Sequence, residues 1–501
     1  MEDAPKVDFT LPAPITDFLF DLHDAMRRGR RVEEVQILYD SKFKEITDKY
    51  FSQSPWPDSA VIAPEVNSDE GFLVFYREMA MRHVTTRLKP QVADHISSWA
   101  NYVKLFDSIL ATGDDELAIS TQWVYDICQE FAYQFQGFCQ FRCQMASVSS
   151  NPETLKALEA NRDAWNLPQV MSILRRLVNA GAGKAGKVGT SSTFLAQFGY
   201  FASIELARLE CLLGDFSASL AAVSDIKLGD RSELFLQLPL CHFNVYYHTG
   251  VCNLMLRRFA TAADVFSEII LHVSRLLKPG AGTSLRGGLQ QQLQRMMDKA
   301  LALTALAAFL HPSKRLDDQV RDLMEAKFAD KIHKLQNPDS FQKSFTDLFD
   351  FASPKFISPV VPDYFSDSAA PAKNDASSRI LSVLLGEVMQ HQNVMRLKSF
   401  LSLYATIDVA KLARFNELTE AELICQLLSY KNKNTQIRPG TSVRVNTSDV
   451  NYYVDTGAIV IDSSSSKTGL DKTYERFFTA GVRKHVEIIN QMNRTFGMLD
   501  M

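Results

Sequence analysis

The sequence predicts a mainly α-helical protein: a right-handed, tetratricopeptide-like helical solenoid, followed by a winged-helix module and a C-terminal helix. Apolar residues recur at steps of three or four from about residue 36 to residue 430. A helical hairpin in this region repeats after 43 residues, which is typical of stacked helical arrays. Strand-like residues are confined to about the last hundred positions, so the β structure belongs to one small C-terminal module.

Composition and charge exclude several classes of protein. The chain has 501 residues, which predicts two to four domains at roughly 150 residues each. Apolar residues make up 46% and charged residues 22%, which excludes wholesale disorder, collagen and a coiled-coil rod. Lys and Arg number 54 against 58 Asp and Glu, a net charge of −4, so no basic excess is available to hold a nucleic-acid backbone.

The sequence favours a cytoplasmic protein without a membrane span. Its seven cysteines, an odd number, fall in predicted helices, unlike the paired cysteines of small secreted domains. The first residues are acidic and lack the apolar core of a secretory signal. The longest uncharged stretch, residues 234–256, is interrupted by Pro239 and by His and Asn residues, which a bilayer-spanning helix tolerates poorly.

An N-terminal tail (residues 1–35) precedes the first helical region (36–179). Its clearest helix, residues 123–143, is expected to bury one face: Val124, Ile127, Phe131, Phe135, Phe138 and Phe141. Residues 180–192 are rich in Gly, Ala and Ser and are expected to form a flexible loop. This loop is close to a phosphate-binding G-x-x-x-x-G-K-[ST] loop, but Val188 has no hydroxyl and the loop follows a predicted helix rather than a strand. We therefore expect no nucleotide or other cofactor.

The helical array is predicted for residues 193–404. Four apolar residues, Phe216, Leu220, Val223 and Ile226, recur 43 positions later as Phe259, Ala263, Phe266 and Ile269. Phe216 and Phe259 are expected at equivalent core positions beside the inter-helix turn. A third unit is expected in residues 285–310, ending near Pro312, and the helical part of the C-terminal module is expected to begin at about residue 286.

No catalytic or metal site is predicted. Cys241, His248 and Cys252 could share one face of a helix, and the last two have the i, i+4 spacing that can hold zinc. No second pair with ligand spacing lies nearby, so we expect these residues, like Cys139 and Cys143, to pack in the core. The H-E-x-x-H and G-x-S-x-G motifs are missing from the sequence. Nothing in it singles out a catalytic residue.

A winged helix is predicted for residues 405–463. Two short helices, residues 408–415 and about 418–431, precede strand-like residues 443–446 and 451–461, with a turn at 455–457. The hairpin residues Tyr452, Val454, Ile459 and Ile461 are expected to face a partner protein beside an open strand edge. Six Lys and Arg stand against seven Asp and Glu in this module, whereas a DNA-binding domain needs a basic surface. We therefore expect no DNA contact.

The C-terminal helix, within residues 464–501, carries an apolar stripe that is expected to bind a partner. Its members recur at helical spacing: Leu470, Tyr474, Phe477, Phe478, Val482, Val486, Ile489, Met492 and Phe496. A solvated terminus with such a stripe would promote aggregation. The helix is therefore expected to pack on its own chain or to join a bundle with another protein.

Five segments resemble one protein family. They are residues 50–83, 122–143 (QWVYDICQEFAYQFQGFCQFRC), 164–166, 354–364 and 399–428. With the order of helical array, winged helix and terminal helix, they resemble the PCI-domain family, which occurs in the proteasome lid, the signalosome and a translation initiation factor. Among the members of the PCI-domain family, the sequence of these segments is most similar to the subunit L family of eukaryotic translation initiation factor 3. The tail before residue 30, the Gly-rich loop and residues 366–378 match this family poorly.

The resemblance implies a non-catalytic scaffold that helps to assemble the initiation factor and to bind it to the small ribosomal subunit in the pre-initiation complex. It also implies that winged helices associate through their sheets and that terminal helices enter a shared bundle. Subunit K is the expected closest neighbour, with subunits E and C nearby. Two alternatives stay open: a scaffold of the proteasome lid or signalosome, and a nucleic-acid-binding winged helix. The segments around Trp56 and Trp123 favour the initiation factor over a scaffold of the proteasome lid or signalosome.

Overall fold

The computed structural model describes residues 11–27, 32–112, 119–147, 152–182, 194–278, 287–311, 315–337, 340–365, 375–437, 444–446 and 450–462, and positions 481, 482, 484–486, 488, 489 and 492. The chain divides into two compact units, Met1–Ser382 and Val383–Met501. Helices dominate both, which confirms the predicted mainly α fold. Across the described residues, no helix combines the length and the apolar character that crossing a bilayer requires.

The N-terminal part of the first unit surrounds one long helix. Its elements are α1 (Ala13–Arg27), α2 (Val32–Ile37), the π-helical turn η1 (Leu38–Lys42), α3 (Phe43–Tyr50), α4 (Ser59–Ile62), the 3-10 turn η2 (Ala63–Val66), α5 (Glu70–Arg87), α6 (Val92–Thr112), α7 (Thr121–Ser147), α8 (Pro152–Ala160) and α9 (Leu167–Ala182). The predicted face of α7 is buried, except that Phe141 is half-buried. Periodicity therefore identified the correct face of this helix.

Aromatic side chains fill the core of this part of the unit. Trp56 lies against Phe43 and Phe51, with ring centroids 4.9 and 4.6 Å apart. Trp165 packs on Phe131 of α7 at 5.3 Å between centroids. Trp56, Phe51, Phe131 and Trp165 belong to the segments that resemble a known family. Those segments therefore supply aromatic side chains to the interior of this unit, where each of them buries a large apolar surface.

Helices α9 and α10 cross at two glycines. A Cβ placed on Gly181 would lie 2.7 Å from the Gly199 Cα, and a Cβ on Gly199 would lie 3.0 Å from the Leu177 carbonyl oxygen. Because neither position has room for a side chain, the two backbones can approach closely. Helix α9 extends to Ala182, so residues 180–182, expected at the start of the flexible loop, are helical. Residues 183–192 of that loop, with Val188, lie outside the described residues.

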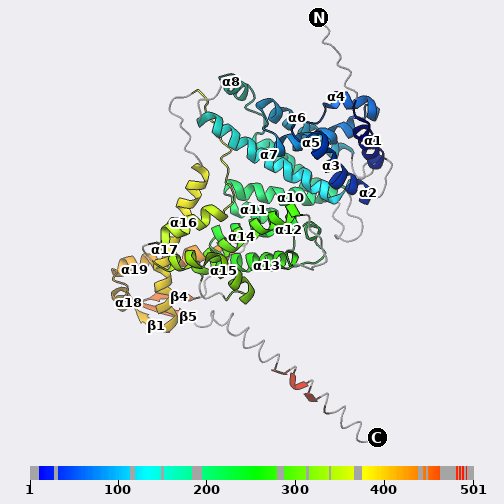
Figure 1. The fold of residues 1–501 in the computed structure, drawn as a ribbon. Helices are drawn as coiled ribbons and strands as arrows, with labels where there is room; N and C mark the ends of the chain where they lie inside the picture. The colour runs from blue at the N-terminus through cyan, green and yellow to red at the C-terminus, as the bar shows by residue number, and fades with distance from the viewer. Residues whose placement is uncertain are drawn as a thin grey trace, which may run out of the picture. The chain divides into compact units, whose positions relative to one another are not determined.

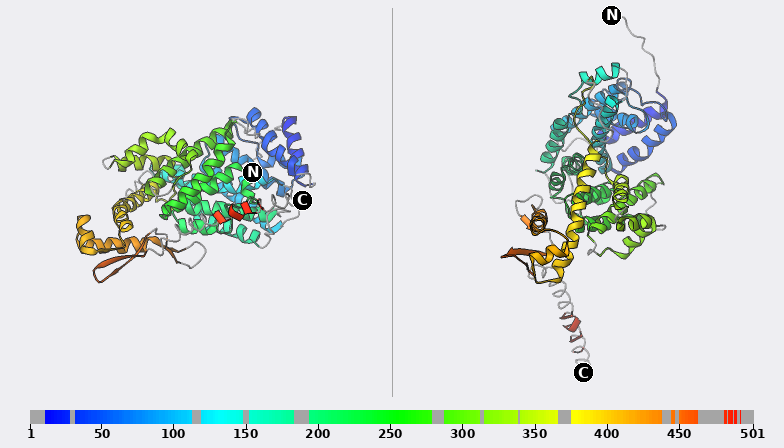
Figure 2. Two further views of the ribbon diagram at one scale, coloured as in Figure 1. Left: turned by 90° about the horizontal axis from the view of Figure 1, so that it is seen from below. Right: turned by 90° about the vertical axis from the view of Figure 1, so that its left-hand side faces the viewer.

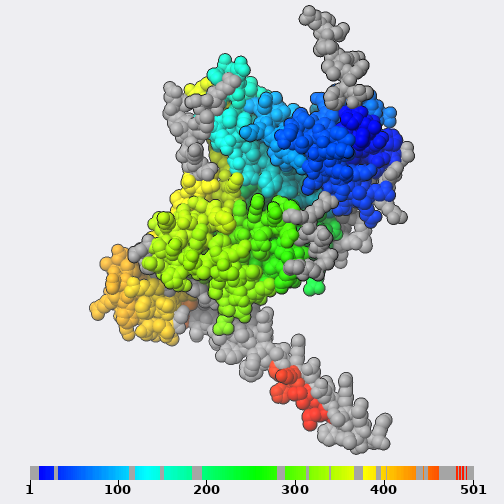
Figure 3. Space-filling view, in the orientation of Figure 1, coloured from blue at the N-terminus to red at the C-terminus, as the bar shows by residue number. Residues whose placement is uncertain are grey.

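The array was predicted for residues 193–404, and the part of it that lies in the first unit ends at Ser382. It consists of α10 (Phe194–Leu213), α11 (Phe216–Ala222), the 3-10 turn η3 (Leu234–Gln237), α12 (Pro239–Met255), α13 (Phe259–Leu276), α14 (Gly287–Leu310), α15 (Asp318–Gln336) and α16 (Phe341–Ala352). Figure 1 shows α10 to α15 (green) stacked beneath α7 (cyan), and Figure 3 shows the same helices in close contact with the N-terminal ones. Within the range expected for the third unit, residues 285–310, seven apolar residues are buried in α14: Met297, Ala300, Leu301, Leu303, Leu306, Ala307 and Leu310.

The two copies of the 43-residue repeat share the geometry of the turn between their helices. Gly214 and Arg257, which are equivalent in the alignment, both adopt positive φ, 91° and 63°. The next amides close the same helix end: Asp215 N donates to Glu210 O at 2.9 Å, and Arg258 N donates to Asn253 O at 2.8 Å. This bonding satisfies the last carbonyls of α10 and α12 in the same way. Phe216 and Phe259 then begin α11 and α13 as predicted.

The first copy of the repeat is shorter than the second. Helix α11 stops at Ala222, whereas α13 continues to Leu276. Val223 and Ile226 consequently lie in turns and are half-buried, although their equivalents in α13 are fully buried. Phe216 is also half-buried, and only Phe259 occupies the expected core position. The two phenylalanines are therefore equivalent in chain geometry but not in burial.

The second unit contains most of α17 (Asp375–Leu403) and the predicted winged helix. Its elements are β1 (Thr406–Asp408), α18 (Val409–Phe415), α19 (Glu420–Asn434), β2 (Thr435–Ile437), β3 (Arg444–Asn446), β4 (Asn451–Asp455) and β5 (Ala458–Asp462). Thr419 and Glu422 form a capping box that begins α19. Strands β1, β5 and β4 form one antiparallel sheet in that order, and β2 pairs with β3 separately. Figure 2 shows the hairpin of β4 and β5 beside the short helices of this unit.

Candidate partner-binding surfaces

A two-residue turn builds the β4–β5 hairpin. Thr456 and Gly457 both have positive φ, 42° and 84°, as a type I′ turn requires, and such turns favour glycine because it has no Cβ. The turn sets the register, which pairs Asp455 with Ala458, Val454 with Ile459, Tyr453 with Val460 and Tyr452 with Ile461. The predicted turn and returning strand are both present.

The inner face of the hairpin belongs to the core of the winged helix itself. Tyr452 and Ile459 are buried in one apolar cluster with side chains from α17, α18 and α19. The Tyr452 hydroxyl donates to the Leu427 carbonyl at 2.5 Å, the ring stacks on Tyr430, and burial raises the pKa of Tyr452. Contrary to expectation, these two side chains offer no surface to a partner, because a small sheet needs one face covered by its own helices.

The exposed apolar surface of the hairpin lies on its other face and near its turn. Tyr453 is 52% exposed and Val454 is 40% exposed, while Ile461 is half-buried against the core. Tyr453 pairs with Val460, which pairs in turn with Thr406, so these residues form a row across the outer face. Tyr453 is not among the residues predicted to bind a partner, because this hairpin carries apolar residues on both faces and the pattern alone does not say which face is covered.

Strand β4 forms an edge of the three-stranded sheet. Among the described strands it pairs with β5 alone. The pair that flanks a two-residue turn is hydrogen-bonded, so the next pair, Val454 with Ile459, is not. In agreement, Ile461 donates its amide to Ala405 beside β1 rather than to β4, at 2.9 Å. The backbone N–H and C=O groups of Tyr452 and Val454 therefore point toward the open edge.

The described part of the C-terminal helix exposes apolar side chains. Val482, Val486 and Ile489 have helical backbone conformation and are 50 to 62% exposed. Their spacing of four and three residues places them on one face of the helix. Ile488 and Met492 are exposed as well. The other predicted members of this stripe, Leu470, Tyr474, Phe477, Phe478 and Phe496, lie outside the described residues.

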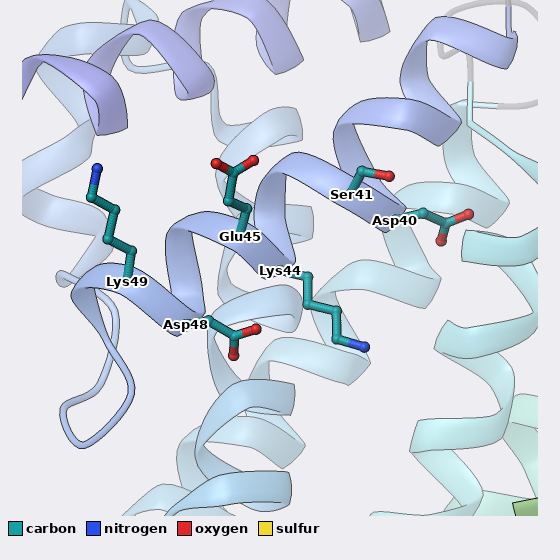
Figure 4. A pocket seen from close by; sticks show the side chains of 6 residues that line it. All are labelled: Asp40, Ser41, Lys44, Glu45, Asp48 and Lys49. Atoms are coloured by element: carbon teal, nitrogen blue, oxygen red, sulfur yellow. The ribbon is translucent and has the colours of Figure 1, made fainter. Parts of the chain in front are cut away.

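One described surface hollow is polar and has no convergent site. It has a volume of about 540 Å³ and is lined by Asp40, Ser41, Lys44, Glu45, Asp48 and Lys49. All six residues come from the continuous helical stretch of η1 and α3, and Figure 4 shows their side chains pointing in different directions. Asp48 is already paired with Arg87 of α5 at 2.5 Å. Carboxylates and lysines alternate here as on a solvated helix face.

The cysteine and histidine residues considered as metal ligands lie in the interior. Cys241 and Cys252 are fully buried, and the Cys252 thiol donates to the Ser219 hydroxyl at 3.2 Å. Burial and the nearby Arg208 lower the pKa of His248 to about 3. Burial raises the pKa of Cys139 to about 12. Within the described residues, no group of three or more His, Cys, Asp or Glu has an arrangement that could hold a metal ion.

Comparison with known proteins gives one consistent family. Residues 94–484 match the family model described as RNA polymerase I-associated factor PAF67. A relative from Nematostella vectensis, named eukaryotic translation initiation factor 3 subunit L, is 32% identical over 97% of this chain and 93% of its own length. Relatives of the same name from Xenopus tropicalis and Homo sapiens are 32% identical over 90% and 92% of this chain, and over 82% of their own lengths.

These matches cover the helical array, the winged helix and most of the chain on either side of them. The resemblance seen in separate segments therefore extends over nearly the whole sequence. The chain belongs to the family of eukaryotic translation initiation factor 3 subunit L.

Proposed function

We propose that this chain is a non-catalytic scaffold subunit of eukaryotic translation initiation factor 3. The observation that carries the proposal is its similarity to subunit L over 97% of the chain and 93% of a relative. In this role it helps to assemble the factor in the cytoplasm and to bind it to the small ribosomal subunit during formation of the pre-initiation complex. Subunit K is the proposed nearest neighbour, with subunits E and C close by.

We assign partner binding to two surfaces. The first is the open edge of β4 with the exposed Val454 and Tyr453, beside the half-buried Ile461. A strand edge of this kind can accept a strand from another protein through backbone hydrogen bonds. The second is the apolar stripe of residues 464–501, for which a helix of a partner subunit is the proposed occupant. The helical array of residues 193–404 is the proposed scaffold, and the winged helix at 405–463 carries the first surface.

Substitution of Val454 by Pro tests the first surface. The Val454 amide points away from β5, so proline removes an edge donor without breaking the hairpin. We expect this variant, expressed in cells, to lose co-purification with the other subunits. Val454→Thr keeps the amide and should stay bound. Circular dichroism should show unchanged helix content in both variants.

Removal of residues 470–501 tests the second surface. The truncated chain should also be lost from the purified factor, while its array remains folded. If both the truncated chain and Val454→Pro remain stoichiometrically bound, the assignment of these surfaces is wrong. If mass spectrometry of the purified wild-type complex finds proteasome-lid or signalosome subunits instead, the proposed function itself is wrong.

A further inference from the structure

We propose that Lys431 is a gate on the open edge of strand β4. In the free chain its ammonium group donates a hydrogen bond to the backbone carbonyl of Tyr452. Another strand can form all its backbone hydrogen bonds with this edge only after the lysine moves away. The inference rests on the proposed function in one respect: in the assembled factor, the strand that displaces Lys431 belongs to a neighbouring subunit.

The position of Lys431 is set by the packing of α19 against β4. Lys431 Nζ donates to the Tyr452 carbonyl at 3.1 Å. The preceding residue, Tyr430, stacks on the Tyr452 ring with an interplanar angle of 2°, and the Tyr452 hydroxyl donates to Leu427 one turn earlier. The same stretch of helix therefore contacts the ring, the hydroxyl and the carbonyl of Tyr452. These contacts hold the ammonium group at the sheet edge.

The occupied carbonyl is one that strand pairing needs. An added antiparallel strand bonds to the N–H and C=O groups of alternate residues, which on this edge are Tyr452 and Val454. The Tyr452 carbonyl accepts a charge-assisted hydrogen bond from Lys431. This bond is lost when the amide of an added strand replaces the lysine, which makes pairing less favourable. Lysine on an edge strand is a known protection against unwanted strand pairing. Here the lysine comes from the helix beneath the edge.

A second copy of the chain is the occupant against which this protection acts most strongly. Antiparallel pairing of two β4 edges about a two-fold axis at Tyr453 would join Tyr452 of each copy to Val454 of the other. Half of the backbone hydrogen bonds between the two strands would be accepted by the Tyr452 carbonyl oxygens. In each free copy, that oxygen already accepts a hydrogen bond from Lys431. The exposed Tyr453 side chains would lie opposite each other and would favour the contact. Lys431 therefore keeps the free subunit from pairing with itself.

Self-association of the full-length chain tests the gate. Lys431→Met keeps most of the side-chain length but cannot donate, and we expect its dimer dissociation constant, measured by sedimentation over a range of concentrations, to fall by about tenfold or more relative to wild type. Lys431→Arg keeps a donor and should behave like wild type. Arg414→Met removes a positive charge from the same unit without touching the edge, and should also behave like wild type.

The double variant Lys431→Met with Val454→Pro shows whether the new contact uses this edge. Proline removes one of the amides that pairing requires, so the double variant should return to wild-type association. If Lys431→Met associates no more strongly than wild type, or if the double variant still dimerises, the gate is wrong. Neither of these outcomes changes the result expected when Val454→Pro is tested for co-purification with the other subunits. Failure of the gate is therefore distinguishable from failure of the proposed function.

Discussion

At the scale of single residues, Asp69 joins two helices of the first unit. Its carboxylate caps α5 by accepting from the Phe72 amide at 3.3 Å, and it pairs with Arg27 at 2.5 Å and with His23 at 3.0 Å, both on α1. The hydrogen bond from the Arg27 guanidinium lowers the pKa of Asp69 to about 2, against the opposing effect of burial. The folded state therefore favours the ionised carboxylate.

We expect this pKa shift to make stability depend on pH. Because the pKa is lower in the folded state than its ordinary value of 3.8, the stabilisation is complete above about pH 4 and is lost as pH falls toward 2. Asp69→Asn should lower the unfolding free energy by about 2 kcal/mol at pH 7 and by much less at pH 2. Denaturant titrations at both pH values measure this difference. Glu70→Gln, which breaks an exposed ion pair with Arg77, should cost under about 1 kcal/mol.

The two phenylalanines of the repeat should differ in their contribution to stability. Phe259 is buried, so Phe259→Ala should cost about 3 to 5 kcal/mol. Phe216 is half-buried and contacts Phe356 edge-on at 6.3 Å, so Phe216→Ala should cost clearly less, about 1 to 2 kcal/mol. Unfolding of each variant in urea tests this order. Equal losses for both would contradict the difference in burial.

At the scale of secondary-structure elements, the crossing of α9 and α10 depends on glycine. Gly181 and Gly199 face each other so closely that an added Cβ would lie 2.7 Å from the opposite Cα. Backbone atoms cannot yield as a flexible side chain can, so the helices must move apart if either glycine is replaced. Gly137 in α7 has no atom within 4 Å of an added Cβ. Gly199 and Gly137 therefore form a matched pair of sites, crowded and open, for the same substitution within the first unit.

Alanine at these sites should change stability in opposite directions. Gly199→Ala should destabilise the chain by about 1 to 3 kcal/mol, because the crossing must separate. Gly137→Ala should stabilise it by about 0.5 to 1 kcal/mol, because alanine is the better helix former. Thermal unfolding followed by circular dichroism compares the two variants. A neutral effect of Gly199→Ala would show that α9 and α10 shift without cost.

At the scale of the whole molecule, three of the five segments that resemble the family meet inside the first unit. Gln136 Nε2 of α7 donates to the Lys355 carbonyl at 3.0 Å, across 219 positions of sequence. Arg142, also on α7, donates to the Ala164 carbonyl at 2.6 Å. Three of the five segments are therefore hydrogen-bonded to one another. These segments therefore contain residues that hold the first unit together.

The charge of the whole molecule predicts that it does not bind duplex DNA on its own. With a net charge of −4, the release of counterions, which drives non-specific binding, contributes little. Fluorescence anisotropy with a labelled duplex at physiological salt should show no saturable binding at submicromolar protein concentration. Salt-sensitive submicromolar binding would contradict the scaffold role and would favour the nucleic-acid alternative.

The sequence by itself determined the helical class, the buried face of α7, the 43-residue repeat and the position of the hairpin turn. Each of these depends on local periodicity or on the conformation of one turn, such as the positive φ at Gly457. The tertiary structure alone decided which face of the hairpin is buried, where α11 ends and how far α9 continues, to Ala182. In a hairpin that is apolar on both faces, the choice belongs to the helices that cover one of them, and these contacts join residues far apart in sequence.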